Sequence, residues 1–174
     1  MRYASWIAAV SLFLFSHCAP RLAAQAPMTT VYVVRHAEKL EPANPDSPLS
    51  PAGEERARAL AALLAKAGVT RIYATTKLRT QQTVAPLAAA RGIAPVVLDP
   101  FATEDLVWRI RNEAKGEVVV VCGHSNTVPG IVNALCGQDI DGIPEEVFDR
   151  LFKVVITPEG GAALEQSRYG AAAP

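Results

Sequence analysis

Four side chains suited to phosphate chemistry follow short apolar runs of this chain: Arg35, His36, Arg79 and His124. The clearest runs are residues 31–34 and 118–122, and a shorter one ends at residue 74. A guanidinium offers a planar fork that matches phosphate, and a histidine near neutral pH can act as a nucleophile or carry a proton. These residue types together predict chemistry on a phosphoryl group.

The positioning elements follow from the pattern of apolar residues. Apolar runs bounded by turn residues predict buried strands at 31–34, 71–74, 95–98, 118–122 and 151–157. Amphipathic segments predict helices at 50–66, 78–91, 105–112 and 128–135, the second of which Pro86 would kink or end early. This alternation predicts a three-layer α/β/α sandwich with a mainly parallel central sheet. Open sheets of this kind bind ligands at the carboxyl ends of their strands.

Several motifs, taken in order, resemble the histidine phosphatase superfamily, the phosphoglycerate-mutase-like group. They are Arg35-His36-Ala37, where the family usually has Arg-His-Gly, the segment 78–83, Gly123-His124-Ser125, and the segment 49–53. The resemblance covers about residues 31–156. It is strongest to the small members without inserts, which include phosphohistidine phosphatases and short secreted proteins.

The resemblance implies a metal-independent phosphatase that hydrolyses phosphate monoesters or phosphoramidates through a phosphohistidine on His36. Arg35 and Arg79 would bind the phosphoryl oxygens, and His124 would donate a hydrogen bond to them. Attack by His36 requires one unprotonated ring nitrogen, so the other needs an acceptor such as a backbone carbonyl. No cofactor is expected. The alternative is a phosphate-binding module of the same fold with little or no turnover, because Ala37 replaces the usual glycine.

Other roles stay open. Many relatives place an acidic proton donor after the second arginine motif, where Glu104 is the candidate here and Asp105 the second. Alternatively, Thr103 or Asp105 caps the next helix and Glu104 is a first-turn acid favoured by the helix dipole. Ser125, Asn126 and Thr127 would each either contact the ligand or cap a helix. The loops that would select the substrate, 40–49, 100–105 and 137–146, contain no decisive motif.

Length and composition limit the function further. The chain has 174 residues, which suits one domain, and its formal net charge of zero argues against a nucleic-acid partner. The expected partner is a phosphorylated small molecule or a phosphorylated surface group. Cys122 and Cys136 are expected to be too far apart along a strand and helix for a disulfide, and their surroundings suggest no metal site.

The first residues resemble an export signal. Arg2 precedes an apolar run, and small residues follow at 22–26. We therefore expect a signal peptide at 1–26, a phosphatase domain at 27–174, and a periplasmic or secreted protein. A lipoprotein anchor at Cys18 is the less favoured alternative, because His17 precedes it. The run is too short for a stable membrane span.

Overall fold

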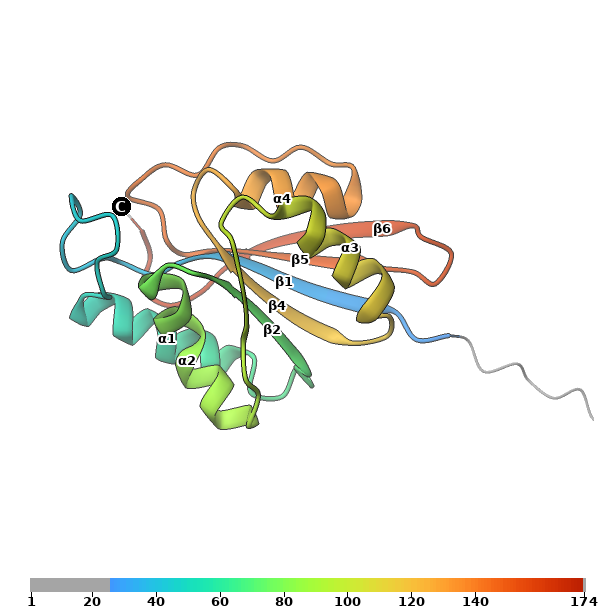
Figure 1. Ribbon diagram of the computed structural model, residues 1–174, viewed down its shortest axis with the longest axis horizontal. Coiled ribbons are helices and arrows are strands. Elements are labelled where there is room, and N and C mark those ends of the chain that lie inside the picture. The colour runs from blue at the N-terminus through green and yellow to red at the C-terminus, as the bar shows by residue number, and fades with distance from the viewer. Residues whose placement is uncertain (1–25, 174) are drawn as a thin grey trace, which may run out of the picture.

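The computed structural model describes residues 26–173, and apart from Ala26 the expected signal segment lies outside them. A six-stranded sheet with the order β3-β2-β4-β1-β5-β6 forms the centre (Figure 1). The strands are β1 Thr29–Arg35, β2 Arg71–Thr75, β3 Val96–Leu98, β4 Val118–Gly123, β5 Arg150–Ile156 and β6 Ala162–Arg168. The helices are α1 Pro51–Leu63, α2 Leu78–Arg91, α3 Thr103–Glu113 and α4 Val128–Cys136.

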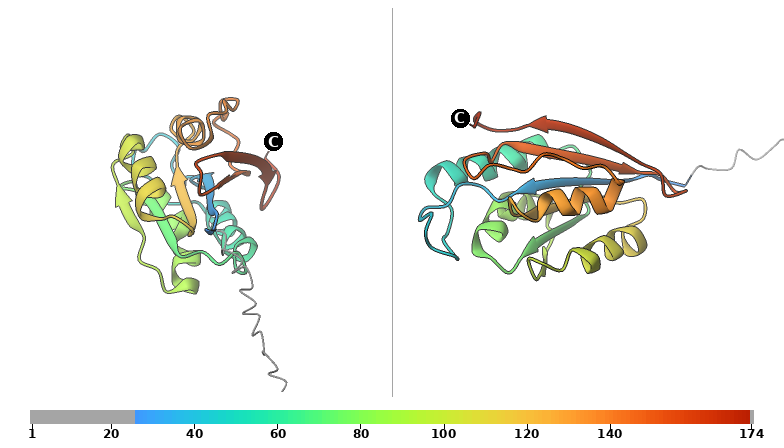
Figure 2. Two further views of the ribbon diagram at one scale, coloured as in Figure 1. Left: turned by 90° about the vertical axis from the view of Figure 1, so that its right-hand side faces the viewer. Right: turned by 90° about the horizontal axis from the view of Figure 1, so that it is seen from above.

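The four strands β1 to β4 pair in parallel, and β5 and β6 add to the β1 edge in antiparallel fashion. Helices α1 and α2 cover one face and α3 and α4 the other (Figures 1 and 2). In β4, Val119 and Val121 pack toward α3 and α4, whereas Val120 and Cys122 pack toward α1 and α2. Burial on both faces explains why this strand is apolar throughout, and it confirms the predicted α/β fold with three layers.

The predicted elements are all present, with small changes at their ends. Helix α2 continues past Pro86 and ends at Gly92, whose φ of 65° is the left-handed conformation typical of a helix end. Ser50 caps α1 by accepting a hydrogen bond from the Gly53 amide, as expected. A Cβ on Gly53 would clash with the Glu38 carbonyl oxygen, so this first turn packs closely on the loop after β1.

The sixth strand was not predicted. Strand β6, with the sequence AALEQSR, is largely exposed and polar on the edge of the sheet, so apolar alternation gives no signal for it. It forms by pairing along its whole length with β5. After it the end of the chain is anchored, because Tyr169 is buried and the Ala173 amide donates to Asp149.

The structure decides between the cap candidates near the sheet edge: it excludes those of α3 and selects Thr127 for α4. Ala102 is the N-cap of α3 and its side chain makes no capping bond, so neither Thr103 nor Asp105 caps this helix. Thr127 is the N-cap residue of α4, and its hydroxyl accepts instead from the His124 amide. Ser125 and Asn126 therefore do not cap α4, which leaves their side chains for other contacts.

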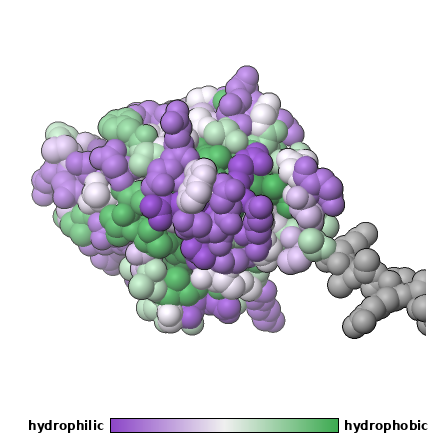
Figure 3. Space-filling view, turned by 45° about the vertical axis from the view of Figure 1, so that its right-hand side comes forward, coloured by the Kyte–Doolittle hydropathy of each residue, from purple (hydrophilic) through white to green (hydrophobic). Residues whose placement is uncertain are grey.

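The described residues 26–173 contain two cysteines, and no disulfide joins them. Both Cys122 and Cys136 are free there, as predicted. No helix among these residues is long and apolar enough to span a bilayer. The face in Figure 3 has hydrophilic side chains gathered at its middle, with smaller apolar areas beside them.

Candidate active site

A cavity of about 400 Å³ opens at the edge of the sheet where β1 and β4 end. It is lined by His36, Lys39, Lys77, Arg79, Pro100, Phe101, His124, Ser125, Asn126, Thr127 and Glu145. The lining contains three of the four residues that the sequence placed at this edge. It also contains two lysines, so the cavity has a positive field suited to an anion.

His36 is the most enclosed ionisable group of this cavity, with 3% of its surface exposed. Its amide donates to the Gly123 carbonyl and continues the β1–β4 pairing, which fixes the backbone. Its Nδ1 lies 2.7 Å from the Ala37 carbonyl oxygen. A carbonyl only accepts, so Nδ1 carries the proton and Nε2 keeps its lone pair. The expected backbone acceptor is therefore present.

Burial, assisted by the charges of Arg79 and Arg35 and opposed by the hydrogen bond to Ala37, lowers the pKa of His36 to about 3. The ring is consequently neutral at pH 7. A neutral imidazole with a free Nε2 is the form that can attack an electrophile.

Thr83 holds the turn after His36 in place. Its hydroxyl accepts from the Ala37 amide at 2.9 Å and donates to the Arg79 carbonyl at 2.7 Å. The hydroxyl thus connects the two arginine motifs through the backbone. Sequence reasoning did not find this role, because a threonine inside a helix has the same signal when it merely packs.

His124 lies beside His36, with the two rings edge to face and their centroids 5.4 Å apart. The Nη2 of Arg79 donates to its Nδ1 at 3.1 Å, so its proton is on Nε2, which lies 3.0 Å from the Thr75 hydroxyl. Burial lowers the pKa of His124 to about 4, assisted by Arg79 and Lys77. In this state its one N–H faces Thr75. Donation to a phosphoryl group requires a proton on Nδ1 and a shift of Arg79.

Arg79 reaches the cavity from the first turn of α2. Its Nη1 donates to the Pro45 carbonyl at 2.8 Å and its Nη2 to His124. Its Nε–H is buried and has no partner among the described residues. Buried polar groups normally have hydrogen-bond partners, so this N–H is a donor available to a bound anion.

Arg35 lies deeper, with 2% of its surface exposed, and does not itself line the cavity. Its guanidinium stacks 4.2 Å above the Phe148 ring and binds the loop at 144–147. Its Nη2 donates to Glu145 at 2.8 Å, and its Nε, like that of Arg79, is buried without a partner in the described chain. Arg35 therefore adds positive charge to the site while anchoring a distant loop.

The candidates Ser125 and Asn126 both line the cavity, and the Ser125 hydroxyl donates to Glu145 at 2.6 Å. Glu104 is exposed in the first turn of α3 and is not among the lining residues. Asp105 is ion-paired with Arg109 on the same helix. Glu145 is the carboxylate that lines the cavity, and no motif in its loop indicated it.

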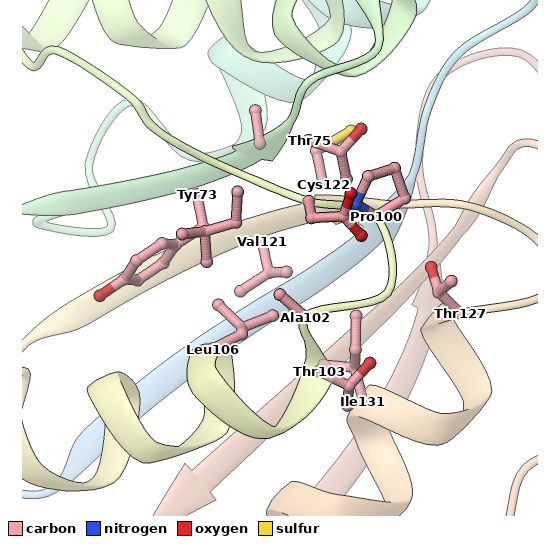
Figure 4. Close-up of a pocket in the computed structure, with 14 residues that line it drawn as sticks. Tyr73, Thr75, Pro100, Ala102, Thr103, Leu106, Val121, Cys122, Thr127 and Ile131 are labelled. Atoms are coloured by element: carbon pink, nitrogen blue, oxygen red, sulfur yellow. The ribbon is translucent and has the colours of Figure 1, made fainter.

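A second hollow lies behind this edge, between the ends of β2 and β4 and the helices α3 and α4 (Figure 4). Its walls are mostly apolar, and its volume is about 20 Å³. That space holds about one water molecule, so it is a packing gap and not a substrate site. Within the described chain, no group of three or more His, Cys, Asp or Glu side chains could hold a metal ion.

Comparison with known families agrees with this geometry. The sequence profile of the histidine phosphatase superfamily (branch 1) matches residues 31–106, which include Arg35, His36 and Arg79. Over this segment, which is less than half of the chain, the protein is similar to the histidine phosphatase superfamily. The match ends before β4, so the placement of His124 in the same site comes from the structure.

A curated relative resembles part of this chain. A probable phosphoglycerate mutase GpmB from Enterobacter sp. (strain 638) is 40% identical over 83 residues. Those residues are 44% of this chain and 38% of that protein, so the match spans well under half of the relative.

Solved structures share the fold over most of the chain. The protein histidine phosphatase SixA complexed with tungstate has a TM-score of 0.62 at 19% identity and covers 80% of this chain and 96% of its own. A putative phosphohistidine phosphatase SixA from Nakamurella multipartitia gives 0.63 at 23%, covering 85% and 100%. Bacillus stearothermophilus YhfR gives 0.64 at 18%, covering 78% and 95%. At these identities the likeness establishes the fold.

Proposed function

We propose that this protein is a metal-independent phosphatase that uses His36 as its nucleophile. The observation that supports this most directly is the state of His36, whose proton is held by the Ala37 carbonyl while Nε2 stays free. This nitrogen belongs to a cavity with Arg79 and His124. A buried neutral imidazole beside cations is suited to attack on a phosphoryl group and poorly suited to a purely structural role.

The proposed reaction has two displacements at phosphorus. Nε2 of His36 forms a bond to phosphorus, and the bond to the leaving group breaks with its electron pair on the leaving atom, which takes up a proton. Water then attacks the phosphohistidine, the P–N bond breaks, and inorganic phosphate and neutral His36 are regenerated. Arg79, with Arg35 behind it, stabilises the charge on the non-bridging oxygens.

The substrate class follows from the missing proton donor. Glu104 lies away from the cavity, and Glu145 is held as a carboxylate by Ser125 and Arg35. We therefore propose substrates whose leaving group departs with little help, such as phosphoramidates (phosphohistidine among them), acyl phosphates or aryl phosphates. The fold likeness to SixA structures agrees with the first of these.

The test is release of phosphate from an aryl phosphate by the parent and by His36→Asn. We expect the variant to lose at least 10³-fold in rate, because the lone pair of the other cavity histidine, His124, is bound to Arg79, while its thermal melting stays close to the parent's. A parent enzyme quenched during turnover at alkaline pH should contain one phosphoryl group on the peptide with His36. A rate within tenfold of the parent's would overturn the mechanism, and tungstate binding without turnover would indicate a phosphate-binding module.

Export is a separate proposal that rests on the sequence at residues 1–26. Fractionation of cells that express the full chain should find the protein outside the cytoplasm and shortened by about the signal length. Retention at full length in the cytoplasm would contradict it, and a lipid-modified amino-terminal Cys18 would establish the lipoprotein alternative.

A further inference from the structure

The side chain of Glu145 lines the cavity that we propose to bind phosphate. Its Oε1 accepts from the Ser125 hydroxyl at 2.6 Å and its Oε2 accepts from Nη2 of Arg35 at 2.8 Å. The Ser125 hydrogen bond and the Arg35 charge lower the pKa of this carboxyl, so it is ionised at neutral pH. A carboxylate thus already binds Ser125, which lines the cavity, and Arg35, which lies behind it.

The backbone around Glu145 is held independently of its side chain. Nη1 of Arg35 donates to the carbonyls of Pro144, Glu145 and Val147, at 2.7, 2.9 and 3.0 Å. These three bonds keep the loop on Arg35 whatever the carboxylate does. The Glu145 side chain is 78% exposed, so it can turn into solvent without unfolding the loop.

We propose that the Glu145 carboxylate is an internal competitor for the phosphoryl group, bound to Arg35 and Ser125 in the free protein and displaced when substrate or phosphate binds. The inference rests on the proposed function, because it takes the cavity to be a phosphate site. Its physical basis is that a phosphate dianion and a carboxylate repel each other and need the same donors. The competition weakens binding of every phosphoryl group and favours release of the product phosphate.

Direct binding of inorganic phosphate and of tungstate, measured by titration calorimetry, tests this competition. Glu145→Ala should bind both anions about tenfold more tightly than the parent, the factor expected for one charge-assisted hydrogen bond at an exposed site. Glu145→Gln should fall between the two, since its amide oxygen still accepts but carries no charge. The matched control is Glu146→Gln, which removes one negative charge from the next residue.

Glu146 is exposed and makes no side-chain hydrogen bond within the described residues. Its variant should stay within about twofold of the parent, because a solvated charge without a shared donor is screened. If Glu146→Gln and Glu145→Ala gained the same anion affinity, the loss of one negative charge near the cavity would explain both. That result would overturn the competition. Thermal melting checks the fold of Glu145→Ala, and Glu145→Gln decides the question if the alanine variant unfolds.

Unchanged or weaker anion binding by both Glu145 variants would overturn the inference. If they also lost rate selectively on substrates with poor leaving groups, Glu145 would be a proton donor instead. The proposed function fails separately: if the parent and Glu145→Ala neither bind these anions nor release phosphate, both proposals fall. If the parent binds and turns over while Glu145→Ala is no tighter, only the competition is wrong.

Discussion

Acidification from pH 7 to pH 5 should destabilise this protein through its two active-site histidines. Burial lowers the pKa of His36 to about 3 and that of His124 to about 4, below the ordinary value of 6.5. Between these values and 6.5 the unfolded chain binds protons that the folded protein does not bind. The free energy of unfolding therefore decreases as the pH falls below about 6.5. Protonation of the folded state would limit this loss only near pH 4 and below.

The magnitude follows from the width of that window. Each histidine costs about 1.4 kcal/mol of unfolding free energy per pH unit below 6.5, or about 2 kcal/mol at pH 5. Together they cost about 4 kcal/mol, which for a domain of this size lowers the melting temperature by about 8–16 °C. Some carboxyl groups also have a lowered pKa, among them Glu117, Asp149 and Glu145. Their contribution to stability is lost only below about pH 4.5, outside the interval from pH 7 to pH 5.

The assay is denaturant unfolding followed by circular dichroism at pH 7, 6 and 5, with the melting temperature as a second readout. His36→Asn and His124→Asn each remove one titrating group, so each variant should show about half of the parent's pH-dependent loss. A parent whose stability changes by less than about 1 kcal/mol across this interval would refute the reasoning. So would variants whose pH dependence equals the parent's.

Three further outcomes are expected. Arg79→Ala should weaken the tungstate-induced rise in melting temperature, whereas an equal rise would place Arg79 outside the anion site. EDTA should leave phosphate release unchanged, and a loss restored by a divalent cation would contradict a metal-independent mechanism. Glu104→Gln should keep the ratio of alkyl to aryl phosphate rates, because its side chain lies off the cavity; a selective loss of about 10²–10⁴ on the alkyl ester would make Glu104 the general acid.

Local patterns in the sequence were sufficient for most of the fold. Apolar runs such as residues 118–122 predict buried strands because a strand covered on both faces must be apolar at every position. Ser50 and Gly92 mark helix ends for reasons that involve only neighbouring backbone. The placement of Arg35 and His36 at a strand end follows equally from their position in the chain.

Those local patterns did not predict pairing between segments that are distant in the chain. Strand β6 is polar, and it exists because β5 offers it an unpaired edge. The predicted N-caps of α3 were wrong for a similar reason. Propensity indicates which residues can cap a helix, but the path of the backbone into the helix decides where it begins.

The chemical state of the site is also a tertiary property. His36 was predicted from its type and place, but the proton on its Nδ1 depends on the position of the Ala37 carbonyl, in a turn whose Ala37 amide binds Thr83 of α2. The contact between Arg35 and Glu145 joins residues 110 positions apart. The sequence alone therefore determined which residues could bind and attack a phosphoryl group, because strand ends and residue chemistry are local. Only the tertiary structure decided their protonation and their partners, because burial and hydrogen bonding at this site are set by loops that are distant in the chain.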